Sequence, residues 1–219
     1  WSSDVCSSDL QQEIDEGFGE EFHGSLEEAT HRWPIGTAFG KLNIIQADGR
    51  DDRLCLDSTV NGLNPSLRLE ETTVNPSVAS VGRCVARDEI DESEVALVAD
   101  VSKAHKRIKV HEDEWGLLLF TVGDRIFFLK VCHYGAGFSA YWWGRMAALV
   151  HRLLHQLIWS AHCGFIFVDD WLWELSRAVA PMQGSLILFT LAIIGCLIKW
   201  SKVAMGPTVT WIVWIVHFD

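Results

Sequence analysis

Two adjacent carboxylates inside an apolar stretch constrain this chain more than any other feature. The stretch CGFIFVDDWLWEL, from Cys163 to Leu175, places Asp169 and Asp170 between two apolar runs. Short runs rich in aromatic and β-branched residues around a polar pair predict a tight hairpin, with both carboxylates at its tip. Because uncompensated charges are costly to bury, such a tip needs solvent, a counter-cation or a metal ion. The stretch therefore predicts either a metal site or a solvated turn, since Asp is also a common turn residue.

The charged residues are distributed unevenly along a chain of 219 residues, which is long enough for one domain or a domain with an appendage. Residues 11–100 hold 19 acidic and 7 basic side chains, whereas residues 101–219 hold 8 and 11, and the formal net charge is -11. A polyanionic partner is expected to meet the second half of the chain. The acidic first half argues against simple non-specific binding of nucleic acid.

The six cysteines form no CxxC pair, so their spacing predicts no zinc site. A chain this long and this rich in core residues does not need a disulfide framework. We therefore expect reduced cysteines and an intracellular protein, cytoplasmic or nuclear. The apolar run from Leu186 to Ile198 has about 13 residues where a spanning helix needs about 20, so no membrane partner is expected. The alternative, a membrane-associated protein that uses this run, predicts detergent-dependent solubility.

Both ends of the chain have unusual sequence. Residues 1–10, WSSDVCSSDL, resemble the translation of a sequencing-library adapter, and we expect them to be an artefact that precedes the genuine sequence from Gln11. The last residues, TVTWIVWIVHFD, predict an apolar strand. We expect the chain to be truncated there.

Turn signals and hydrophobic periodicity predict the remaining elements. Residues 11–24 and 58–93 are expected to be mostly irregular. The expected elements are a helix capped by Ser25 and Glu28 that ends near Arg32, hairpins over 41–57 and 115–131, a buried strand over 94–100, helices over 136–157 and 178–194, and strands over 199–219.

The order of these elements resembles the palm of a polymerase, most closely that of reverse transcriptases from LTR-type and related retrotransposons. The likeness runs from about Lys41 to the C-terminus. It implies an α+β fold with a ferredoxin-like β-α-β-β-α-β palm core and a partial fingers hairpin. The implied domains are a partial fingers region over 11–93 and a palm over 94–219, with no thumb after it.

Three acids carry the implied chemistry. ADVSKAHKRIKV resembles the first palm motif, in which Asp100 is the metal ligand, and FVDD resembles the third motif with its paired acids. The resemblance implies that Asp100, Asp169 and Asp170 are catalytic and hold two Mg²⁺ ions, a place that Mn²⁺ could also take. Taken alone, Asp100 is better suited to cap a helix after a strand, and only the order of the motifs favours a metal ligand.

The resemblance also implies residues that contact substrates. His105 stands where the family usually has the Tyr or Phe that excludes a ribose 2′-hydroxyl, and Val213 stands where it usually has Gly. The implied nucleotide-binding residues are Arg53, Val101, His105, Gly135, Ala136 and Lys199, with Lys41 or Arg50 as a second cation that the sequence does not choose between. The implied template–primer contacts are Ser139, Arg145, Trp211 and Trp214. The alternatives without a functional role are a surface cation for Arg53, a solvated helix face for Arg145 and a strand-edge cation for Lys199.

The resemblance implies an RNA-directed DNA polymerase fragment that joins deoxynucleoside triphosphates to a primer 3′-hydroxyl on an RNA or DNA template. The competing expectation is a decayed palm that is only a nucleic-acid-binding scaffold or a non-functional repeat copy. Survival of all three acids favours the first, whereas the departures at His105 and Val213 favour some decay. The sequence leaves the oligomeric state open.

Overall fold

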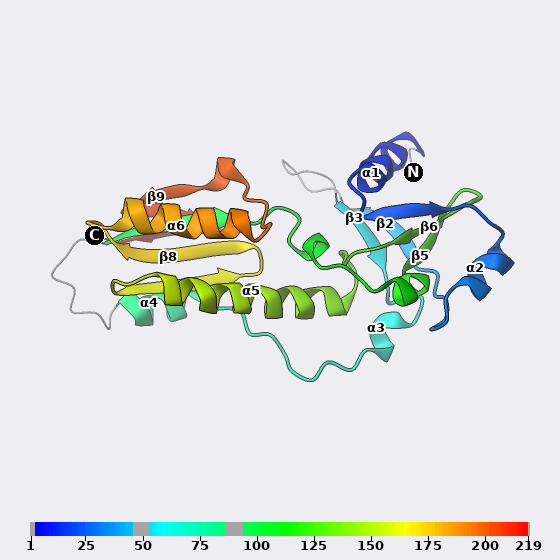
Figure 1. Ribbon diagram of the computed structural model, residues 1–219, viewed down its shortest axis with the longest axis horizontal. Helices are drawn as coiled ribbons and strands as arrows, with labels where there is room; N and C mark the ends of the chain where they lie inside the picture. Colours follow the sequence, from blue (N-terminus) through cyan, green and yellow to red (C-terminus); the bar gives the residue numbers. More distant parts are fainter. Residues whose placement is uncertain (1–2, 46–52, 86–93, 219) are drawn as a thin grey trace. The chain divides into compact units, whose positions relative to one another are not determined.

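The chain folds into two units that interleave along the sequence in the computed structural model (Figure 1). Unit 1 comprises residues 1–72 and 105–142, and unit 2 comprises residues 73–104 and 143–219. The structure describes residues 3–45, 53–85 and 94–218.

Unit 2 is built on a four-stranded antiparallel sheet. Residues 95–100 are buried without interruption, as expected for a strand that is covered on both faces. In sheet order the strands are β7 (His162–Phe167), β8 (Asp170–Ser176), β4 (Glu94–Asp100) and β9 (Ala204–Gly206). After β4 the chain passes through residues 105–142 of unit 1, which include the start of helix α5 (Gly137–Leu157), and then forms β7, β8, helix α6 (Ala180–Ile193) and β9.

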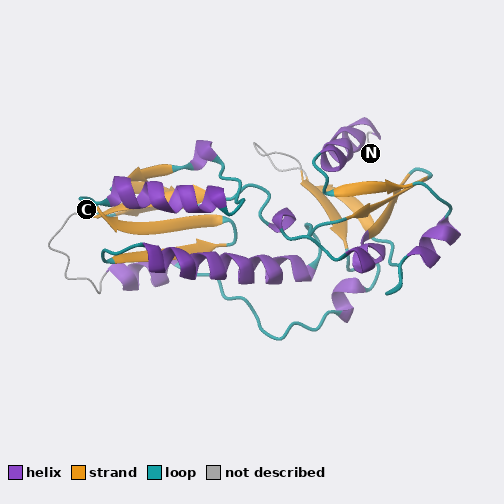
Figure 2. Ribbon diagram, viewed as in Figure 1, coloured by secondary structure: helices purple, strands orange, loops and turns teal. Residues whose placement is uncertain are grey.

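The two faces of this sheet are covered differently, because side chains alternate between faces along each strand. Val98 and Leu172 pack with Trp211 in one core cluster, which also takes in helix α4 (Val78–Val85) through Val81. The hairpin of β10 (Thr208–Trp211) and β11 (Trp214–His217) therefore covers this face. Helices α5 and α6 cover the other face (Figure 2), where Gly184 of α6 approaches Leu97.

Helix α5 confirms the expected long helix. Its buried residues Trp143, Ala147, Val150 and Leu154 recur at helical spacing, as an amphipathic helix requires. In unit 2, the N-terminal part of α6 contains Pro181, which the first turn of a helix tolerates because that N–H has no intrahelical partner. The remaining element of this unit is the 3₁₀ turn η3 (Trp200–Lys202).

Unit 1 contains a three-stranded antiparallel sheet and a separate hairpin. The sheet has the order β1 (Gly19–Phe22), β6 (Arg125–Leu129) and β5 (Leu119–Val122), and the hairpin joins β2 (Lys41–Ile45) to β3 (Arg53–Asp57). The turn expected for this hairpin lies outside the described residues. The helices of unit 1 are α1 (Ser3–Asp15), α2 (Leu26–Arg32) and α3 (Leu63–Ser66), and its 3₁₀ turns are η1 (His105–Arg107) and η2 (Glu112–Leu118).

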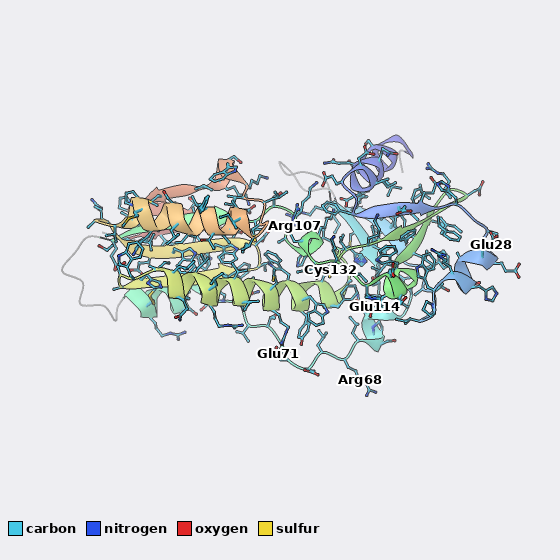
Figure 3. The ribbon with its side chains drawn as sticks, viewed as in Figure 1. Glu28, Arg68, Glu71, Arg107, Glu114 and Cys132 are labelled. Atoms are coloured by element: carbon cyan, nitrogen blue, oxygen red, sulfur yellow. A yellow bond between two sulfur atoms is a disulfide. The ribbon has the colours of Figure 1, made fainter. Side chains whose placement is uncertain are left out.

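Helix α2 confirms the predicted capping box. The Ser25 hydroxyl accepts from the Glu28 backbone N–H at 3.1 Å, and the Glu28 carboxylate accepts from the Ser25 backbone N–H at 2.7 Å. Two otherwise unsatisfied donors at the helix start are thereby paired. Glu28 is labelled in Figure 3.

Several segments differ from the expectation of irregular structure. Residues 11–24 contain the end of α1 and the strand β1, and residues 58–93 contain α3 and α4. The hairpin expected over 115–131 is confirmed as β5 and β6, although residues 115–118 belong to the 3₁₀ turn η2 and not to the first strand. The sequence GEEF has no strand pattern of its own, so β1 arises from its pairing with β6.

The expectation of fully reduced cysteines is wrong, because Cys84 and Cys163 form a disulfide. Their Cα atoms lie 6.7 Å apart, within the range that a disulfide bridges. The bond joins α4 to β7 across 79 positions of sequence, a pairing that spacing alone cannot reveal. Cys55, Cys132 and Cys196 do not form disulfides.

Two further expectations concern organisation. None of the helices in the described part of the chain is both long and apolar enough to cross a membrane. The compact units do not coincide with the expected boundary at residues 93 and 94, because residues 105–142 belong to unit 1. The division into fingers and palm stays a prediction.

Candidate active site

Asp100 and Asp170 face each other across the two central strands of unit 2. They are register partners in the antiparallel β4–β8 pair, so their side chains point to the same face of the sheet. Val98 and Leu172 lie on the same face. Asp100 is buried there, with 5% of its surface exposed. Two carboxylates in such a pair repel each other unless a cation or a proton lies between them.

Asp169 lies in the two-residue turn between β7 and β8, because Phe167 pairs with Asp170. The first turn residue, Val168, has φ of 57°, a left-handed conformation that a β-branched residue rarely adopts. The Val101 backbone N–H donates to the Asp169 carbonyl at 3.0 Å. The end of β4 thereby holds the turn, and Asp169 is joined through the backbone to the residue that follows Asp100.

Lys202 supplies a positive charge to this group of acids. Its ammonium forms an ion pair with Asp100 and lies 3.9 Å from an Asp170 oxygen. Burial lowers the pKa of Lys202, but the hydrogen bond to Asp100 and the negative charges of the three aspartates together outweigh it, so the pKa is raised. Burial, followed by the charge of Asp169, raises the pKa of Asp170 to about 6, although Lys202 opposes the rise.

The donor set fits a hard divalent cation in its chemistry. Three carboxylates supply only oxygen ligands, which Mg²⁺ prefers, and a half-buried carboxyl with a raised pKa gains from a nearby cation. Among the described residues, however, no three His, Cys, Asp or Glu side chains already stand in a metal-binding arrangement. In this arrangement Lys202 is the cation that contacts the acids.

Arg53, which is predicted to bind the triphosphate, and His105, which stands at the position that excludes a ribose 2′-hydroxyl, lie together in unit 1. The Arg53 guanidinium stacks over the Tyr134 ring at 5.2 Å, and the His105 ring meets the edge of Tyr134 at 5.3 Å between centroids. Arg53 is exposed and His105 is half-buried. Of the two candidate second cations, Lys41 opens β2 and Arg50 lies outside the described residues.

The predicted small residues form a tight turn in unit 1. Gly135 has φ of 103°, and a Cβ there would clash with the Leu56 carbonyl oxygen, so only glycine fits. Asn64 brackets the turn, because its amide donates to the Gly135 carbonyl at 2.7 Å and accepts from the Gly137 N–H at 2.8 Å. Ala136 is buried beside this turn.

Other predicted contact residues have structural contacts of their own. The Ser139 hydroxyl is buried and accepts from the His133 backbone N–H at 3.0 Å. Burial raises the pKa of the nearby Cys132 thiol to about 11 (Figure 3). Val101 and Trp211 are also buried, whereas Arg145, Lys199 and Trp214 are exposed. All of their predicted contacts with substrate stay predictions.

Sequence reasoning placed Lys199 at the nucleotide, but Lys202 is the lysine whose ammonium reaches the acids. The Lys199 backbone N–H donates to the Asp100 carbonyl at 2.9 Å, while its side chain is exposed. The two lysines flank the 3₁₀ turn η3, with Lys199 just before it and Lys202 as its last residue. The sequence alone does not distinguish which of the two reaches the acids.

Solved structures with a similar fold were found, although comparisons of sequence found no match. No protein-family model and no curated protein matches the chain. A foamy viral protease-reverse transcriptase in complex with dsDNA matches with a TM-score of 0.73 at 11% identity, over 97% of this chain and 39% of that one. The chain has a reverse-transcriptase-like fold.

Two further solved structures agree. A foamy viral protease-reverse transcriptase in complex with an RNA/DNA hybrid matches with a TM-score of 0.71 at 14% identity, over 99% of this chain and 26% of that one. A mutant of the prototype foamy virus protease-reverse transcriptase matches with a TM-score of 0.69 at 14% identity, over 95% of this chain and 25% of that one. The chain thus spans between 25% and 39% of these three proteins' length.

Proposed function

We propose that the chain is a fingers–palm segment of an RNA-directed DNA polymerase, in which Asp100, Asp169 and Asp170 hold divalent cations. The single observation that carries the proposal is the register pairing of Asp100 with Asp170 next to the Asp169 turn, on a reverse-transcriptase-like fold. With the inserted β5–β6 hairpin set aside, the order β4-α5-β7-β8-α6-β9 along the chain and the sheet order β7-β8-β4-β9 support a ferredoxin-like palm. The retrotransposon group remains part of this proposal.

The residues of the chain have distinct tasks in this function. Bound Mg²⁺ would neutralise charge on the transferring phosphoryl group and make the primer 3′-hydroxyl a better nucleophile. Asp100 and Asp170 offer facing carboxylates from rigid strands, and Asp169 offers a third from the turn. In unit 1, Arg53 would contact the triphosphate, and the Gly135 turn would let a base pair approach the backbone closely.

Single-nucleotide addition to a primer on an RNA template tests the proposal without requiring processive synthesis. We expect addition that depends on a divalent cation and falls on the order of 100-fold in Asp169→Asn, the scale of losing one electrostatic stabiliser of a transition state. Asp124→Asn is the matched control, because Asp124 is exposed in the β5–β6 turn of unit 1. Equal addition by the wild-type chain and Asp169→Asn would contradict the proposal.

A second candidate function is a nucleic-acid-binding scaffold without catalysis. The observation that favours it is the ion pair of Lys202 with Asp100, because an internal cation already compensates the acids there. Binding of an RNA/DNA hybrid without any nucleotide addition, and with no effect of Asp169→Asn on divalent-cation affinity, would support the scaffold.

A further inference from the structure

The turn that carries Asp169 is strained and must be held by its surroundings. Val168 occupies the first position of a two-residue hairpin loop with φ of 57°. Glycine is the usual residue at such a position, because a β-branched side chain crowds the backbone in this conformation. Strained residues persist only where neighbouring contacts over-determine their conformation.

Three successive carbonyl groups of this turn accept hydrogen bonds from three different elements. The Val168 carbonyl accepts from the Trp143 indole N–H at 2.7 Å, and the Asp170 carbonyl accepts from the Trp211 indole N–H at 3.4 Å. Between them, the Asp169 carbonyl accepts from the Val101 backbone N–H. The donors come from α5, β10 and the residue after β4, all within unit 2.

The two indoles are buried, so their N–H groups need a partner. Trp143 and Trp211 are each 2% exposed, and a buried donor without a partner is costly. Burial alone does not produce such bonds here, because Trp171 and Trp173 are fully buried and their indole N–H groups have no partner among the described residues. The two bonds to the turn are therefore a specific feature of Trp143 and Trp211.

We propose that Trp143 and Trp211 are positioning residues, whose indole N–H groups fix the Val168–Asp170 turn and so place the carboxylates of Asp169 and Asp170. This inference rests on the proposed function where it concerns cation binding. The Trp143 bond is shorter than the Trp211 bond and ends on the strained residue itself, so Trp143 has the larger effect.

Trp143→Phe keeps an aromatic ring in the core and removes the donor. We expect its Mn²⁺ dissociation constant to rise by about tenfold or more, the range found for groups that orient metal ligands. Trp211→Phe should give a smaller rise. Trp173→Phe is the matched control, because it removes the same buried volume without removing a bond to the turn.

Val168→Gly separates positioning from general stability. Glycine adopts the turn conformation without strain, so the turn no longer needs the indole bond. Adding Val168→Gly to Trp143→Phe should therefore restore Mn²⁺ affinity to within about twofold of the Val168→Gly chain, since the remaining difference would reflect packing only. Urea unfolding of each variant measures stability separately.

Hydrogen exchange at residues 167–170 gives a readout that does not depend on cation binding. We expect the backbone amides there to exchange faster in Trp143→Phe than in the wild-type chain. The double variant should exchange at the rate of the Val168→Gly chain, and Trp173→Phe at the wild-type rate. Unchanged exchange and Mn²⁺ affinity in Trp143→Phe would overturn the inference, as would equal losses in Trp143→Phe and Trp173→Phe. If Asp169→Asn leaves Mn²⁺ affinity unchanged, the proposed function fails, and exchange at the turn alone then decides the positioning role.

Discussion

At the scale of residues, the charge balance among Asp100, Asp170 and Lys202 defines the site. Asp170 has its pKa raised to about 6, so without a bound cation its ionised form costs stability above that pH. Its stabilising contribution is full below the ordinary carboxyl pKa and is lost as pH rises through about 6. In the proposed function, a divalent cation at the acids would remove this cost.

His133 gives the opposite dependence on pH. It is 3% exposed, and neither ring nitrogen has a hydrogen-bond partner among the described residues. Burial, followed by the charge of Lys106, lowers its pKa to about 3, so the folded chain holds the ring neutral. Stability from this group is full above the ordinary histidine pKa and is lost as pH falls toward 3.

We predict that His133→Phe flattens the acid side of the stability profile. Between about pH 8 and about pH 5 the wild-type chain should lose on the order of 2 kcal/mol more than His133→Phe. Urea unfolding at the two pH values measures this difference, with the exposed His31→Phe as control. A His133→Phe chain with the wild-type pH profile would show that His133 is not held neutral.

At the scale of elements, the Cys84–Cys163 disulfide joins α4 to β7, a strand of the unit 2 sheet. Closing a loop of this length should stabilise the folded chain by about 2–4 kcal/mol. We predict this loss in Cys84→Ser under oxidising conditions, measured by urea unfolding.

Cys196→Ser is the control for that prediction, because Cys196 is a cysteine of the same unit that does not form a disulfide. A reducing agent should bring the wild-type chain close to Cys84→Ser and leave Cys84→Ser itself unchanged. An equally stable Cys84→Ser chain would mean that the bond contributes nothing to the fold.

Elements with a periodic pattern could be predicted from the sequence, and elements created by tertiary contact could not. The spacing in α5 and the apolar runs of β4, β7 and β8 each indicate their own structure. The strand β1 could not be predicted, because its sequence GEEF becomes a strand only through β6. Helix α4 was hidden by Gly82 and by its small size.

The acids of the site could be predicted, but the residues that hold them could not. Asp169 and Asp170 stand out because a charged pair interrupts apolar sequence. Trp143, Trp211 and Lys202 each have a residue of the same type within three positions, and only the fold decides which one reaches the turn or the acids.

At the scale of the whole molecule, the fold is reverse-transcriptase-like, while the sequence is far from those of the foamy viral proteins. Identities of 11–14% to the foamy viral structures leave the fold recognisable and the activity open. The net charge of -11 also opposes binding of a polyanion, so divalent cations should matter for any template–primer contact.

The central claim is that the three acids hold divalent cations, and titration of the intact chain with Mn²⁺, followed by the EPR signal of the free ion, tests it most directly. The account predicts saturable binding that weakens by at least about tenfold in Asp169→Asn and is unchanged in Asp124→Asn. Equal Mn²⁺ affinity in the wild-type chain and Asp169→Asn would contradict it, and the acids would then be a turn neutralised by Lys202.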